Sequence, residues 1–140
     1  MKKKKLMFDL LFLLYAVCLI WITVIRNGIC FNSLFTNGDL HIIPFVGLYN
    51  ILKNNIFTFC YLFIGNILWF VPLGLYLKYR TCLDIGVITF LGFLTSLAIE
   101  FFQYMFGTGV TETDDLILNT VGTLTGVILM TIIEKRKRQS

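Results

Sequence analysis

Long apolar segments separated by short polar ones dominate the chain. A bilayer is crossed by about 20 apolar residues in a helix. Four segments reach that length, at about residues 6–25, 56–77, 83–106 and 115–133. The pattern therefore predicts an all-α, polytopic membrane protein, with four transmembrane helices in a single domain over residues 1–140.

Residues 26–55 depart from this pattern, because polar side chains interrupt them repeatedly. Their longest apolar stretch, residues 42–52, is too short to span a bilayer. The stretch is aromatic and partly amphipathic, which favours a position along the membrane interface or beside the helices. We therefore expect an outer interfacial or re-entrant segment between the first and second helices.

The composition agrees with this pattern. Hydrophobic residues make up 57% of the 140 residues and charged residues 14%, and the mean hydropathy is +0.81. Soluble domains carry about 25% charged residues. So few charges exclude a water-soluble enzyme, and the high hydrophobicity excludes a disordered chain. The first apolar run is longer than the ~7–15-residue core of a signal peptide, so we expect a retained helix.

Basic residues indicate the orientation in the membrane. Ten of the twelve lysine and arginine residues lie at positions 2–5, 78, 80 and 135–138. The positive-inside rule places these positions, and with them both termini, in the cytoplasm. Each basic run adjoins an apolar segment, which favours contact with the lipid bilayer and its anionic headgroups over nucleic acid.

Several polar side chains fall inside the predicted spans, where an ionisable group costs at least ~2.5 kcal/mol at the helix centre. Glu100 and Gln103 are expected to share one face of the third helix, and Asp115 and Asn119 one face of the fourth. A short loop joins these helices, so the two faces can meet in the outer half of the bilayer. We predict an outward-facing polar binding site formed by Asn66, Glu100, Gln103, Asp114, Asp115 and Asn119.

Two interpretations of this site stay open. Its side chains can bond one helix to another, at about 0.6 kcal/mol per hydrogen bond. They can also bind a ligand, with Glu100 as the candidate catalytic acid or base. Carboxylates at positions 100, 114 and 115 suit Mg²⁺ or Ca²⁺, so a divalent cation bridging to phosphate is a further hypothesis. No other cofactor and no metal-ligand spacing of cysteine or histidine is indicated.

Three segments carry more specific motifs. Residues 41–45 read HIIPF, residues 65–74 read GNILWFVPLG, and EFFQ at 100–103 precedes DLILNTVG at 115–122. In this order they resemble the segments N-L-I-P-F, G-N-hh-hF-hP-h-G and E-hh-Q…D-hh-hN-hhG of the VanZ-like (teicoplanin-resistance) membrane protein family, where h is apolar. The chain departs from that pattern at His41, where asparagine is usual, and in lacking an arginine before Asp115.

The resemblance implies a small four-helix protein of the bacterial cytoplasmic membrane, typical of Gram-positive cell envelopes. Some relatives lower susceptibility to teicoplanin-type glycopeptide antibiotics. We therefore expect the chain to alter the cell surface through its polar site, by binding a lipid headgroup or a cell-wall lipid precursor. The residues expected to have structural roles are Pro44, Phe45, Pro72, Gly74, Gly122 and Gly126.

Two other function classes remain as alternatives. The first is a membrane-embedded enzyme that acts on a lipid-linked substrate, with Glu100 as its acid or base. The second is a small proton-coupled transporter subunit, in which Glu100 carries the proton. Four helices offer little path for a solute, so this alternative needs a homo-oligomer, for which Gly122 and Gly126 are candidate contacts.

Overall fold

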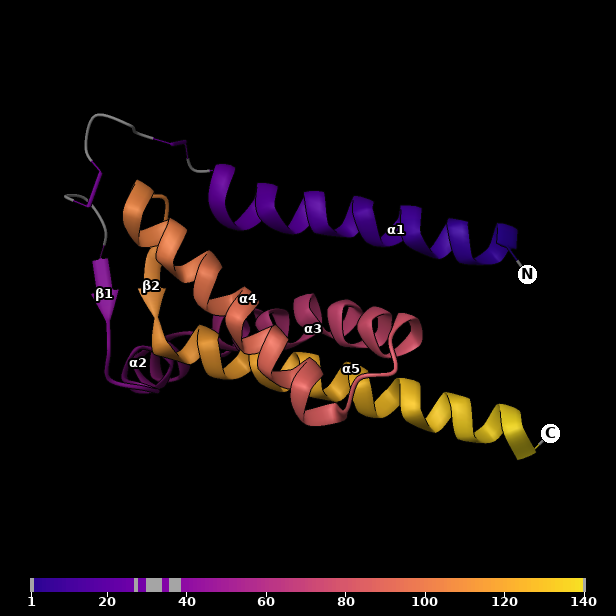
Figure 1. Cartoon of the computed structure of the whole chain (residues 1–140). Coiled ribbons are helices and arrows are strands. Elements are labelled where there is room, and N and C mark those ends of the chain that lie inside the picture. Colours follow the sequence, from indigo (N-terminus) through magenta and orange to yellow (C-terminus); the bar gives the residue numbers. More distant parts are fainter. Residues whose placement is uncertain (1, 27, 30–33, 36–38, 140) are drawn as a thin grey trace.

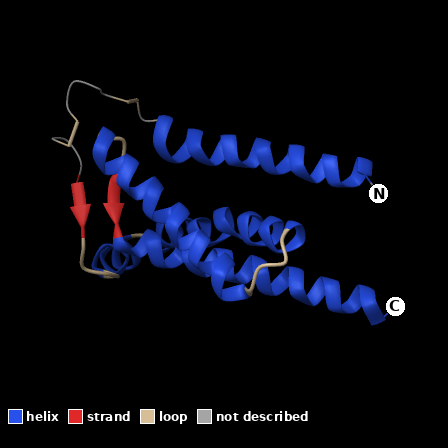
Figure 2. Ribbon diagram, in the orientation of Figure 1, coloured by secondary structure: helices blue, strands red, loops and turns tan. Residues whose placement is uncertain are grey.

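The computed structural model describes residues 2–26, 28–29, 34–35 and 39–139, and helices make up most of it (Figures 1 and 2). In chain order the elements are α1 (Lys2–Ile20), the π-helix η1 (Trp21–Ile25), β1 (Asp39–His41), α2 (Val46–Asn54), α3 (Ile56–Arg80), α4 (Ile85–Phe106), β2 (Val110–Glu112) and α5 (Thr113–Gln139).

Within the described residues, four helical segments are long and apolar enough to cross a membrane. They are Lys5–Ile25, Ile56–Arg80, Ile85–Phe106 and Thr113–Lys137. The predicted fold class is thereby confirmed. The last of the four helices extends beyond its predicted apolar span at both ends, because hydropathy marks only the apolar part of a helix.

Local signals account for several helix ends. The side chain of Asn55 accepts a hydrogen bond from the amide of Thr58 at 3.1 Å and so caps the start of α3. Gly107 ends α4 in the left-handed conformation, with φ of 63°. Pro72 lies inside α3 and does not end the helix.

The segment between α1 and α3 contains the short helix α2, which overlaps the predicted interfacial stretch. It lies at the same end of the molecule as β1 and β2, whereas both chain termini lie at the opposite end (Figure 1). The strands pair in parallel, with Asp39 opposite Val110 and His41 opposite Glu112. Hydropathy did not predict this small sheet, because each strand has only three residues and the pairing joins distant parts of the chain.

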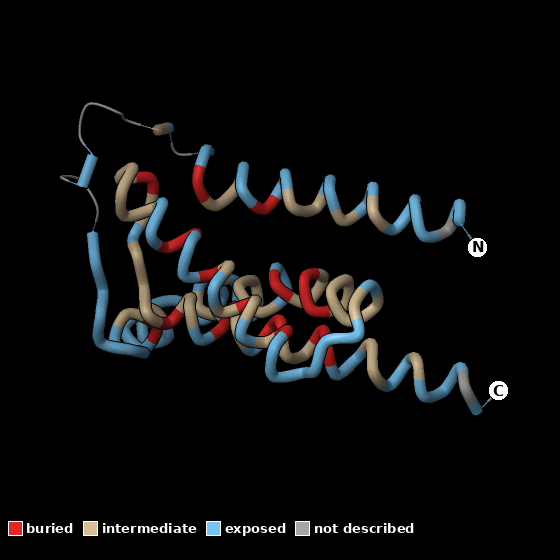
Figure 3. Tube along the Cα trace, viewed as in Figure 1, coloured by how far each residue is buried: buried red, intermediate tan, exposed pale blue. Residues whose placement is uncertain are grey.

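Buried positions lie along the helix contacts (Figure 3). They include several polar side chains, whereas many large apolar side chains are exposed, as expected in lipid. Glu100 is 2% exposed and Asn119 5%, whereas Phe57 is 85% exposed and Tyr61 74%. Lipid offers no hydrogen-bond partner to a polar group, and it is as apolar as leucine, so it does not drive leucine inward. A small apolar core joins α1, η1, α3 and α4 through Leu19, Val24, Phe70, Leu73 and Ile99.

Glycines bring α3 and α5 into backbone contact, the most extensive helix pairing in the described part of the chain. A Cβ added at Gly74 would lie 2.0 Å from the carbonyl oxygen of Thr123, and one added at Gly122 would lie 2.2 Å from that of Ile67. At Gly126 it would lie 2.2 Å from another carbonyl of α3. Gly122 and Gly126 are therefore used inside the chain, and their buried surfaces do not face a second copy.

Gly74→Ala is expected to lower the free energy of unfolding by about 1–3 kcal/mol, because the added methyl group must force the two backbones apart. Gly65→Ala, on the same helix, is the matched control, since a Cβ there meets nothing within 4 Å. The control should leave stability unchanged or raise it by up to about 1 kcal/mol. Unfolding by SDS titration in mixed micelles measures both variants. Equal stability of the two would contradict the close contact.

Candidate functional site

Polar side chains line the contact between α4 and α5. Gly92, Ser96 and Glu100 follow one another at four-residue intervals, so they share the face of α4 that meets α5. Asn119 donates a hydrogen bond through Nδ2 to Oγ of Ser96 at 2.8 Å. Thr123, which is fully buried, packs against Gly92. We refer to Ser96, Glu100, Asn119 and Thr123 as the polar seam.

Glu100 lies at the strand end of this seam. Its Oε2 accepts a hydrogen bond from the backbone amide of Glu112 at 3.1 Å, and its backbone carbonyl accepts one from the hydroxyl of Thr111 at 3.0 Å. These bonds attach β2 to the last turns of α4. The carboxyl group of Asp115 is close enough to interact electrostatically with Glu100, so two acids share one buried region.

Asp115 and Asp114 bind different partners, although they are consecutive. Asn66 donates a hydrogen bond from Nδ2 to Oδ1 of Asp115, which joins α3 to α5. Asp114 is buried, and its Oδ1 accepts a bond from the amide of Phe45 at 2.5 Å. Phe45 has a φ of 64°, a left-handed conformation that costs roughly 1–2 kcal/mol for a non-glycine residue. Asp114 thus stabilises the strained start of α2.

Two more exposed contacts lie next to the strand end of the polar seam. The Nδ1 atom of His41 lies 3.0 Å from Oε1 of Glu112, next to the β1–β2 pairing. The hydroxyl of Thr113 donates to the carbonyl of Ile42 at 2.9 Å. His41 and Glu112 are far apart in the sequence, and no spacing relates them. Ser96, by contrast, stands four residues before Glu100, a spacing that indicates a shared helix face.

The structure places Gln103 apart from the seam. Its Nε2 donates to the backbone carbonyl of Thr23 in η1 at 3.0 Å. A three-residue offset turns a side chain by about 60° around the helix, which is enough to face a different neighbour. The structure therefore gathers Asn66, Glu100, Asp114, Asp115 and Asn119 in the halves of α3, α4 and α5 nearer the strands, and it directs Gln103 toward η1.

One atom of the seam has no partner in the described part of the chain. Oδ1 of Asn119 is buried and accepts no hydrogen bond. An unpartnered buried acceptor costs about 1–3 kcal/mol. A hydroxyl, amide or ammonium group of a ligand can supply the missing donor.

The geometry lends no support to the divalent cation. The described residues contain no group of three histidine, cysteine, aspartate or glutamate side chains that could hold a metal ion. The separate bonds of Asp114 and Asp115 explain this, because the two carboxylates are engaged by Phe45 and Asn66.

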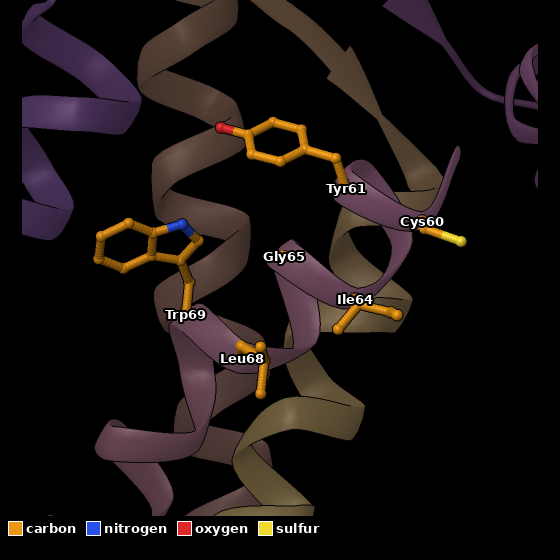
Figure 4. Close-up of a pocket in the computed structure, with 6 residues that line it drawn as sticks. All are labelled: Cys60, Tyr61, Ile64, Gly65, Leu68 and Trp69. Carbon is orange, nitrogen blue, oxygen red and sulfur yellow. The ribbon is translucent and has the colours of Figure 1, made fainter. Parts of the chain in front are cut away.

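A hollow of about 520 Å³ lies elsewhere, on the surface of α3 (Figure 4). Tyr61 and Trp69 stand about one helical turn to either side of Gly65, whose missing side chain leaves the space between them. The remaining lining residues are Cys60, Ile64 and Leu68. No member of the polar seam lines this hollow, whose walls are mostly apolar.

The sequence is similar to a known family of proteins. The profile of the VanZ/LLP1 family matches residues 12–134. The chain is 30% identical over 130 residues to Protein VanZ of Enterococcus faecium, across 90% of this chain and 74% of that protein. No solved structure matches the chain. The matched region contains the whole polar seam together with Asn66, Asp114 and Asp115.

The bond between Asn66 and Asp115 is expected to couple α3 to α5 energetically. In a double-mutant cycle with Asn66→Ala and Asp115→Ala, the coupling energy should be about 0.6–2 kcal/mol, the range of interhelical hydrogen bonds in membranes. Unfolding by SDS titration measures the cycle. Pairing Asn66→Ala with Asp84→Ala, an exposed site, is the control and should give additive effects. Additive effects in both cycles would contradict the bond.

Proposed function

Because the chain belongs to the VanZ/LLP1 family, we propose that it lowers the susceptibility of bacteria to teicoplanin-type glycopeptide antibiotics by altering the cell surface. In this proposal the polar seam is a binding site rather than only a bond between helices. The protein acts by holding a lipid headgroup or a cell-wall lipid precursor at the outer face of the membrane.

The observation that carries the proposal is the unpartnered acceptor of Asn119, whose partner Ser96 stands one turn of α4 before the buried Glu100. Side chains that only hold helices together are expected to satisfy one another, since each unsatisfied group in lipid is costly. Here a carboxylate is buried in a membrane-spanning helix, and a nearby amide oxygen is left free. That combination favours a site that a ligand completes.

The charges of the site indicate which ligand groups fit it. Glu100 and Asp115 are acids that share one buried region, and Glu112 and Asp114 lie close to Asp115. An anionic phosphate would be repelled by these groups. Hydroxyl, amide and ammonium groups can donate to carboxylate and amide oxygens instead. We therefore propose that the site binds the hydroxyl or amide portion of a lipid-linked headgroup.

For the orientation, we propose that both termini lie in the cytoplasm and that β1, β2 and α2 lie outside. Ten of the twelve basic residues support this arrangement through the positive-inside rule. The two termini lie at the same end of the molecule, opposite the strands (Figure 1).

Expression in a sensitive host tests the function. Cells that carry the chain should grow at higher teicoplanin concentrations than cells that carry an empty vector. Glu100→Gln should lose more than half of this increase, because it removes the charge while an amide oxygen can still accept the bond from Glu112. The minimum inhibitory concentration is measured at matched amounts of membrane-inserted protein.

Asp84→Asn is the matched control for that experiment, because it makes the same chemical change at an exposed position outside the seam. It should retain the wild-type resistance. If the wild-type chain leaves teicoplanin susceptibility unchanged, the proposed function is wrong. If wild type and Glu100→Gln protect equally, the polar seam is not the site.

Reporter fusions test the orientation. Green fluorescent protein after Ser140 should fluoresce, since it folds in the cytoplasm, and alkaline phosphatase at that position should be inactive. Alkaline phosphatase inserted after Asn54, at the end of α2, should be active because the enzyme requires the outer side. The opposite pattern of activity would reverse the proposed orientation.

A further inference from the structure

A second cavity, of about 620 Å³, lies between α1, α3 and α5. It is nearer the chain termini than the strands, and no residue of the polar seam lines it. Both α1 and α5 pack against α3, but they are not a closely packed pair themselves among the described residues. The cavity is therefore the space that α1 and α5 leave open on one side of α3.

The walls of this cavity are apolar and aromatic. Phe12 of α1 stacks on Tyr76 of α3, with ring centroids 3.7 Å apart and planes inclined by 3°. One turn closer to the N-terminus, Phe8 contacts Tyr79 in a tilted arrangement, with ring centroids 5.1 Å apart and planes inclined by 38°. Ile133 adds an aliphatic side chain from α5. These walls offer an apolar chain more contact than the open lipid does, because they are fixed in place.

Charged groups lie at or beside the end of the cavity toward the termini, whereas at the other end the hydroxyl of Tyr15 donates to the carbonyl of Trp69 at 2.6 Å. Asp9 lies 2.9 Å from Nε of Arg80 and accepts a bond from the hydroxyl of Tyr76 at 3.1 Å, so these groups satisfy one another. Lys137 also lines the cavity, and it forms no ion pair with any residue that the structure describes. The cavity thus combines an apolar interior with one uncompensated positive charge.

We propose that this cavity binds an anionic phospholipid, with one acyl chain between α1, α3 and α5 and the headgroup phosphate beside Lys137. Basic pockets between transmembrane helices are characteristic sites for anionic headgroups. The volume lies within the range of about 300–1,000 Å³ that is typical of ligand sites.

A helix from a second copy fits the cavity less well. A helix with a diameter of about 10 Å fills about 800 Å³ for roughly every 10 Å of its length. That exceeds the whole cavity, and a helix would also leave Lys137 without an anion. The lipid site is independent of the proposed function, because it depends on different residues at the other end of the molecule.

Native mass spectrometry of the purified full-length chain in neutral detergent tests the proposal. Phosphatidylglycerol and phosphatidylcholine with identical acyl chains are titrated separately. The chain should retain phosphatidylglycerol more tightly. Lys137→Gln should weaken its binding about fivefold, as expected for one basic residue near an anionic surface, and should leave phosphatidylcholine binding unchanged.

Lys135→Gln is the matched control, since Lys135 is exposed in the same basic run but does not line the cavity. It should change phosphatidylglycerol binding much less than Lys137→Gln. Leu11→Trp, which fills the cavity from α1, should weaken binding of both lipids. Equal effects of the two lysine variants would show attraction to the basic run as a whole and would overturn the site.

Three further outcomes would also overturn the proposal. Equal binding of the two lipids would remove the role of the charge. Displacement of phosphatidylglycerol by inorganic phosphate at the same concentration would show that the acyl chain is not held. A dimer that Leu11→Trp disrupts, with no bound lipid, would assign the cavity to a second copy of the chain.

Discussion

The backbone contact between α3 and α5 determines where the other helices can lie. At Gly74, Gly122 and Gly126 a carbonyl of one helix occupies the position where the other would carry a side chain. No hydrophobic effect drives helices together inside a bilayer, so dispersion and hydrogen bonds must hold them. Both weaken steeply with distance. Because the glycines set a short separation, Asn66 and Asp115 meet directly. Helix α4 packs on the neighbouring face of α5, where Gly92 meets Thr123.

The surrounding lipid then decides which side chains turn inward. A polar group that faces lipid has no partner, whereas an apolar one loses little by facing it. This asymmetry gathers Ser96, Glu100, Asn119 and Thr123 along the contact between α4 and α5 and leaves large apolar residues outside. Most polar atoms of this region satisfy one another. The free oxygen of Asn119 is an exception, and the proposed ligand site rests on it.

The end of the molecule with the strands and the end with the termini differ in charge and in the ligand that we propose for each. Acids gather at the end with the strands, where β2 links Glu100 and His41 through Glu112. Basic residues gather at the end with the termini, where Lys137 borders an apolar cavity. The ligands that we propose are a donor of hydroxyl or amide groups for the first end and an anionic amphiphile for the second. A phospholipid bound between α1 and α5 would also stabilise α1, which has fewer neighbours than the other long helices.

Hydropathy by itself determined the four spans, the short segment between the first two, and the membrane as surroundings, because each of these depends on local composition and length. Polar residues inside the apolar spans and the family motifs also indicated the residues worth attention, including Glu100, Asn119 and the glycines of α5. Only the tertiary structure decided which of them meet. The pairing of β1 with β2, the turn of Gln103 toward η1, and the separate partners of Asp114 and Asp115 depend on helix rotation and separation. Those quantities arise from side-chain packing between distant segments, and hydrophobic periodicity along one segment does not contain them.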